Sequence, residues 1–78
     1  MATRRAPPLL TEDRWEEMHY TLSSAIAEET RVRVTLFDEY EDRAMEGIPT
    51  LSGQSLRLRD GGIFHSVPLL RMTNVESV

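Results

Sequence analysis

The spacing of apolar residues changes once along this chain, and that change sets the strongest limit on its fold. Before the change, the apolar residues recur at intervals of three and four, which is the pattern of one buried helical face. They are Trp15, Met18, Leu22 and Ile26. From residue 32 the interval becomes two, as in the stretch VRVTL, and alternation of this kind is typical of a half-buried strand. The sequence therefore predicts one helix followed by strands.

The predicted helix spans residues 11 to 29. Thr11 suits the N-cap because its hydroxyl oxygen can accept a hydrogen bond from a free N–H group of the first turn. The positive end of the helix dipole stabilises the acidic residues that follow Thr11. Residues 1 to 10 contain two consecutive prolines and are predicted to be a flexible N-terminal arm. Residues 11 to 78 then form a single helix-plus-barrel domain.

Turn-forming residues divide the remainder into about five short strands. Asp60-Gly61-Gly62 is the strongest hairpin signal, because Asp-Gly fits the turns whose twist matches paired strands. Gly47 indicates a bulge or sharp bend, and Pro49 indicates an edge, a bulge or a strand end. The stretches IFHSVPL and RMTNVES are predicted as the fourth and fifth strands. The fold class is therefore mainly β with one N-terminal α-helix, as a small, strongly bent, five-stranded antiparallel barrel whose closure removes most edges.

The predicted core combines the helical face with the apolar positions of the strands. Trp15 and Met18 are interpreted as part of this core, with an exposed hot spot on the helix as the alternative. The other members are Leu22, Ile26, Val32, Val34, Leu36, Leu56 and Leu58.

Arginines alternate with these apolar residues in the segments RVRV and LRLR. Arg31, Arg33, Arg57 and Arg59 should share the outer face of the sheet, with acids of the second strand between them. The simpler interpretation is a solvated, internally neutralised face. The functional interpretation is a site for an anion or an acidic partner, since arginine presents a rigid fork of donors to carboxylates and phosphates.

Composition excludes several other classes. The chain has 78 residues and no cysteine, so apolar burial must stabilise it without disulfides or thiolate metal sites, and a reducing cytoplasm is the simplest location. A formal net charge of -4 opposes non-specific attraction to nucleic acid. The sequence has no apolar run of about 18 residues, so no membrane span is expected.

No group of residues predicts a reaction, and we expect no catalytic residue, no metal and no cofactor. His19 and His65 lie far apart in the sequence and are expected to be partly buried. The acidic stretch FDEYED lacks the spacing and the central glycine of a calcium loop, so a solvated turn is predicted. The serines have no nucleophile elbow around them.

The order of the helix, RVRVTLFDE, MEGIPTLSGQSLRLRDGG and VPLLRMTNVE resembles the YolD-like family of small bacterial and phage proteins. It is also similar to the wider Sm-like pattern. The resemblance covers roughly residues 14 to 76 and rests on Gly47, LRLRDG and VPL. It implies a non-enzymatic small barrel of Sm-like or SH3-like type that serves as an accessory to Y-family translesion DNA polymerases in the DNA damage response.

We therefore expect an interaction protein that works by binding a protein partner. The alternative is an Sm-like oligomer that binds a nucleotide, another anion or RNA through its arginines. The Asp-x-x-Asn signature of uridine-binding Sm proteins is missing from IPTLSGQ, so RNA is not favoured.

A homo-oligomer is also expected. The stretch FHSVPLLRM carries several apolar residues and a single charge, so a strand edge there would be poorly protected against pairing with a second copy. Contact between subunits would also stabilise so short a chain. The predicted interface residues are Phe64, Val67, Leu69, Leu70 and Met72.

Overall fold

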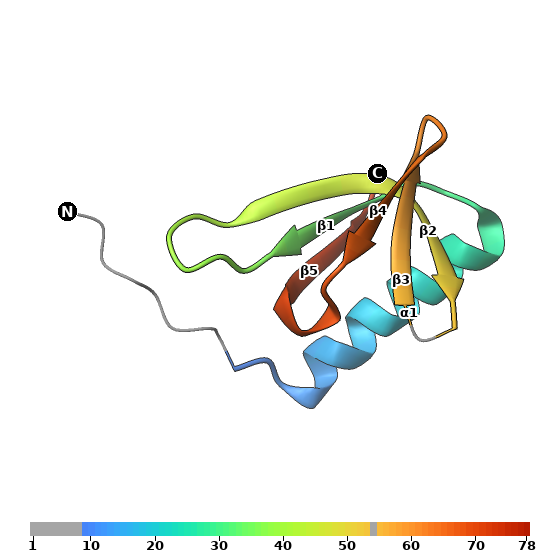
Figure 1. The fold of residues 1–78 in the computed structure, drawn as a ribbon. Helices are drawn as coiled ribbons and strands as arrows, with labels where there is room; N and C mark the ends of the chain where they lie inside the picture. Colours follow the sequence, from blue (N-terminus) through green and yellow to red (C-terminus); the bar gives the residue numbers. More distant parts are fainter. Residues whose placement is uncertain (1–8, 54) are drawn as a thin grey trace.

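A computed structural model describes residues 9–53 and 55–78 (Figure 1). The described residues form one α-helix, five strands and a short 3-10 helix. In chain order these are α1 (Glu12–Glu28), β1 (Val32–Leu36), β2 (Arg43–Ser52), β3 (Ser55–Asp60), β4 (Ile63–Val67), η1 (Leu69–Arg71) and β5 (Met72–Ser77).

The helix begins where the sequence predicts. The Thr11 hydroxyl accepts a hydrogen bond from the Arg14 backbone N–H at 3.2 Å, which makes Thr11 the N-cap. The helix ends at Glu28, and Glu29 takes the left-handed conformation with φ 54°. Of the predicted N-terminal arm, residues 1–8 lie outside the described residues, whereas Leu10 packs against the core.

The strands form one antiparallel sheet in the order β4-β3-β2-β1-β5. β2 changes partner halfway along its length. Its residues 43–47 pair with β1, and its residues 48–52 pair with β3. Figure 1 shows β2 as a long ribbon that bends between these two halves. The sheet consequently folds around its own inner face.

Gly47 stands at the point where β2 changes partner. A Cβ atom there would lie 2.9 Å from the Arg59 carbonyl oxygen and 3.0 Å from the Leu58 Cβ. Only glycine permits the two strands to approach this closely, which accounts for the predicted bend. Pro49 follows in the half of β2 that has β3 as its only partner strand among the described residues, so the missing N–H breaks no second ladder.

The helix packs on β2 and β5 and closes the inner face of the sheet (Figure 1). Seven of the predicted core residues are buried there: Met18, Leu22, Val32, Val34, Leu36, Leu56 and Leu58. Ile26 is only half-buried. Met18 is buried, but Trp15 keeps 38% of its surface exposed, so the two residues do not share the predicted environment.

The predicted class, mainly β with one helix and five antiparallel strands, is confirmed. The sheet is not closed, because β4 and β5 stand at its two ends, so the term barrel applies only loosely. The predicted fourth strand was too long, since Pro68 ends it and Leu69–Arg71 forms η1. The described residues contain no helix with the length and apolar content needed to cross a bilayer.

Replacing Leu58 by Ala should lower the free energy of unfolding by about 2–5 kcal/mol, because this side chain is fully buried in the core cluster. Chemical denaturation measures the change. The neighbouring exposed Arg57→Ala serves as the control and should stay within about 0.5 kcal/mol of the parent. A Leu58→Ala variant as stable as the parent would contradict the register of β3.

Replacing Gly47 by Ala should cost about 1–3 kcal/mol, because the new methyl group meets a backbone oxygen held in the β2–β3 ladder. This clash outweighs the gain of about 0.4–1 kcal/mol that Ala brings by restricting the unfolded chain. Thermal and chemical unfolding both report the difference, and Ser52→Ala at the exposed end of the same strand is the control. A stabilised Gly47→Ala protein would show that β2 and β3 can separate here freely.

Candidate functional site

The four predicted arginines divide into two groups, according to whether acidic residues lie beside them. Arg33 lies directly between Glu46 of β2 and Glu76 of β5, and its guanidinium is 3.3 Å from the Glu46 carboxylate. The Arg31 guanidinium is 3.0 Å from the Asp60 carboxylate. Both ion pairs are exposed, and exposed ion pairs contribute about 0–1 kcal/mol each to the free energy of unfolding. For Arg31 and Arg33 the simpler interpretation, a neutralised face, is therefore supported.

Arg57 and Arg59 have different neighbours. Arg57 stands between Thr50 and Ser66, and Arg59 stands between Ile48 and Phe64. None of these four neighbours carries a charge. Neither guanidinium makes an ion pair with any residue that the structure describes. The unneutralised part of the predicted arginine face is therefore confined to β3.

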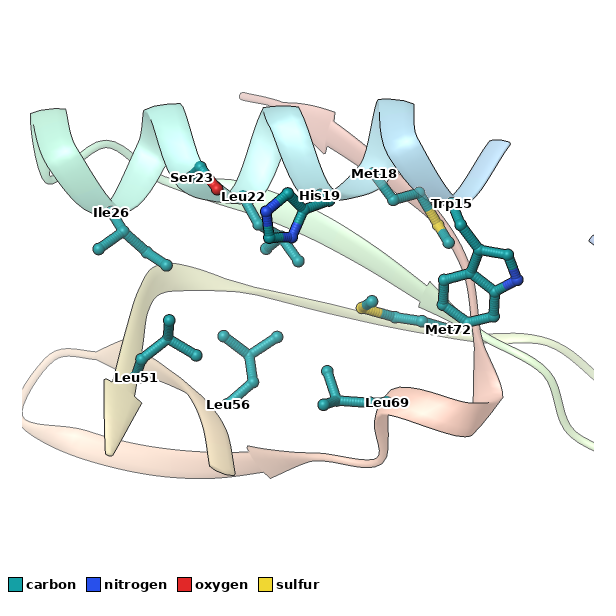
Figure 2. Close-up of a pocket in the computed structure, with 10 residues that line it drawn as sticks. All are labelled: Trp15, Met18, His19, Leu22, Ser23, Ile26, Leu51, Leu56, Leu69 and Met72. Carbon is teal, nitrogen blue, oxygen red and sulfur yellow. The ribbon is translucent and has the colours of Figure 1, made fainter. Parts of the chain in front are cut away.

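An apolar groove runs along α1 on the inner side of the sheet (Figure 2). Its volume is about 270 Å³. The helix supplies one wall, and the end of β2, the start of β3 and η1 supply the other. Figure 2 shows Leu51, Leu56 and Leu69 facing the helix across the opening. The complete lining is Trp15, Met18, His19, Leu22, Ser23, Ile26, Leu51, Leu56, Leu69 and Met72.

The groove has a buried floor and exposed edges. Met18 and Leu56 are each 2% exposed, so its floor belongs to the core. At its edges, Leu51 is 62% exposed and Leu69 is 40% exposed. Trp15, the single tryptophan of the chain, marks one end. Large apolar side chains gathered in this way around one opening form a surface that a partner can cover.

Acidic residues stand beside this groove on the helix. Glu12 and Glu16 surround a shallow depression that also includes Trp15 and His19. Asp13 and Glu17 continue the acidic surface over the next face of the helix. His19 is exposed at the rim, so the expected partial burial of His19 was wrong, and the same holds for His65. His65 is exposed because α1 covers β2 and β5 rather than β4.

The predicted oligomer-interface residues occupy unlike environments. Val67 and Met72 are buried in the core of the single chain, so their side chains do not form an exposed surface. Phe64 is 55% exposed on β4. Leu69 and Leu70 lie on η1, and Leu70 is 95% exposed. Self-association stays a prediction. Of the predicted interface residues, only Phe64, Leu69 and Leu70 are exposed and could contact a second copy.

The acidic loop before β2 is stabilised by local interactions. The Asp38 carboxylate accepts a hydrogen bond from the Tyr40 backbone N–H at 3.1 Å. This hydrogen bond, together with one from Glu41 and the nearby charges of Arg43 and Arg71, lowers the pKa of Asp38. Among the described residues, no group of three or more His, Cys, Asp or Glu side chains is arranged to hold a metal ion.

Taken together, the helix, the bent sheet and the groove define a small mainly β protein with an open apolar surface. A family model described as YolD-like protein matches residues 2–75, which is nearly the whole chain. The chain therefore belongs to the YolD-like family, as its sequence resemblance indicated. Searches of curated proteins and of solved structures found no significant match.

The sequence did not predict the groove, although one signal was present. Leu51 is a large apolar residue that opens the stretch LSGQ, whose serine and glycine favour a turn, so a polar residue would be expected there. It shares the inner parity of β2 with Pro49 and lies opposite Leu56. Its exposure follows from the end of β2 projecting past the surface that α1 covers.

The lowered pKa of Asp38 makes a contribution to stability that depends on pH. Because the pKa in the folded chain lies below the ordinary value of 3.8, this contribution is complete above that value and is lost as the pH falls through the folded pKa. The difference in free energy of unfolding between the parent and Asp38→Asn should therefore shrink on acidification from neutral pH. Urea denaturation at a series of pH values measures it. A difference that stays constant into the acid range would contradict this origin.

Proposed function

We propose that this protein works as a binding protein whose apolar groove receives a basic amphipathic helix of a partner protein. The observation that supports the proposal is the groove itself, with Leu51 and Leu69 exposed at its edges above a buried floor. An amphipathic helix that lays its apolar face into such a groove is a common mode of peptide recognition. In the specific version of this proposal, the partner is a Y-family translesion DNA polymerase of the same bacterium or phage.

The shape and lining of the groove favour side chains of a protein over a small molecule. Small-molecule sites usually enclose about 300–1,000 Å³ and contain several convergent polar groups. Here the volume is about 270 Å³, and only His19 and Ser23 in the lining carry polar side chains beside the Trp15 indole. Apolar anchors of a partner helix fit this chemistry.

The charge beside the groove favours a basic partner. Glu12 and Glu16 flank the end of the groove at Trp15. Among the described residues, no basic side chain forms an ion pair with either of them. Lysine or arginine on the polar side of a docked helix would meet these carboxylates at the rim. Such rim charges raise the rate of association and make it sensitive to salt.

The partner test uses the purified Y-family polymerase of the same organism, titrated onto the parent protein and onto Leu51→Glu. Leu51 is an exposed groove residue, so a charge there blocks the opening without disturbing the core. We expect the variant to bind about tenfold or more weakly, as for loss of an interface anchor. Tyr40→Glu is the matched control, because Tyr40 is also 62% exposed but lies outside the groove.

Two outcomes would overturn different parts of the proposal. If the polymerase binds both variants as tightly as the parent, the groove is not the docking site. If the polymerase does not bind the parent at all, the specific version is wrong. With a peptide segment of the polymerase that lacks tryptophan, the fluorescence of Trp15 adds a direct signal, because this residue is the only tryptophan of the chain and lines the groove.

A further inference from the structure

A second surface, away from the groove, is formed by β4 and the outer face of β3. β4 is the last strand of the sheet and packs extensively on β3 alone among the described elements. Four of its five residues are exposed, and only Val67 is buried. The strand IFHSV contains no lysine, arginine or proline, which are the residues that usually protect an edge from further pairing. This edge is therefore open to another strand.

The hairpin geometry indicates which backbone groups face that edge. Asp60 and Ile63 close the two-residue turn Gly61-Gly62, in which both glycines have positive φ (60° and 88°). In such a hairpin the closing pair is hydrogen-bonded, and pairs then alternate along the ladder. Phe64 and Ser66 occupy the alternate positions, so their N–H and C=O groups point away from β3. They offer a docking ladder for an added strand.

The charged side chains of β3 select the sequence of that strand. Arg59 stands directly opposite Phe64, and Arg57 directly opposite Ser66, on the outer face of the sheet. Both arginines are exposed, and their neighbours on β2 and β4 are uncharged. Strands in a sheet lie about 4.8 Å apart. An arginine side chain extended over β4 thus meets a carboxylate that reaches back from the next strand.

We propose that the β4 edge binds an extended acidic segment of a partner protein by strand addition. Carboxylates at alternate positions of that segment pair with Arg57 and Arg59, and the residue between them lies on the other face of the sheet, the face of Leu58 and His65. Paired fork-like contacts between arginine and carboxylate give this recognition its geometry. The surface is separate from the groove and would bind a segment of opposite charge.

The charges favour an acidic partner over a second copy of this chain. The other free edge, β5, presents Asn74 and Glu76 on the outer face, so it supplies one carboxylate where two are needed. That carboxylate accepts a hydrogen bond from the Asn74 side chain at 2.7 Å and also faces Arg33 across β1. A nucleic acid strand could meet the same arginines, but it has no peptide backbone to pair with the β4 edge.

The test measures binding of a labelled peptide in which Glu alternates with Val, by fluorescence anisotropy at low salt. The double variant Arg57→Gln/Arg59→Gln should bind about tenfold more weakly. The matched control is Arg31→Gln/Arg33→Gln, which removes the same charge from arginines that are already paired, and it should bind within about twofold of the parent. Equal losses in the two double variants would reduce the effect to net charge and overturn the proposal.

Three further experiments distinguish strand addition of the acidic segment from the other molecules that could occupy the β4 edge. A peptide with N-methyl groups on the edge that faces β4 cannot complete the ladder and should not bind, so equal binding of this peptide would overturn strand addition. A single-stranded oligothymidine that binds more tightly than the acidic peptide would also overturn the proposal. Sedimentation equilibrium of the parent shows whether a second copy takes the edge. A dimer abolished by Phe64→Lys, with no peptide binding, would assign the edge to self-association.

Discussion

The close approach of β2 and β3 at Gly47 is the constraint on which the rest of this structure depends. β2 pairs with β1 before this residue and with β3 after it, so the sheet can fold around a core only if β2 bends there. The Arg59 carbonyl lies where a Cβ atom of residue 47 would be. The bend allows Leu58 of β3 and Val34 of β1 to enter the same buried cluster, although they stand on opposite sides of β2. A flat sheet would separate them.

One helix covers a sheet of this shape incompletely. α1 packs on β2 and β5 and is tied to β5 by Arg14, whose guanidinium donates to the Thr73 carbonyl at 3.4 Å and to the Asn74 side chain. The end of β2, η1 and β4 extend beyond the helix. Their apolar residues consequently stay at the surface, as with Leu51, Leu69 and Phe64. These exposed apolar side chains mark both surfaces described above.

Cross-strand neighbours give chemically identical side chains different properties on this sheet. Arg33 has an acid on each side, whereas Arg57 and Arg59 have none on either neighbouring strand. The acids of α1 gather beside the groove on the other side of the sheet. A protein with a modest net charge thus carries one acidic and one basic surface. Local charge of this kind, rather than the total, determines which partners a surface attracts.

The sequence by itself determined the helix, the order of the strands and most of the positions that the core uses. The helical spacing that ends at Ile26, the alternation that starts at Val32 and the Asp60-Gly61 turn are local signals, and local backbone preferences are enough to interpret them. Gly47 likewise indicated a bend, and Pro49 indicated an edge, a bulge or a strand end. The resemblance to the YolD-like family could also be recognised from the sequence.

Only the tertiary structure decided which of these residues face solvent and which charges remain unpaired. Trp15 and Met18 share one helical stripe and line the same groove, yet Met18 is buried in its floor and Trp15 stands exposed at its end. Val67 and Met72 likewise lie in the core. The separation of Arg33 from Arg57 depends on strand register, which joins residues far apart in the chain. Periodicity assigns a side chain to a face, but burial and charge pairing depend on what other segments place against that face.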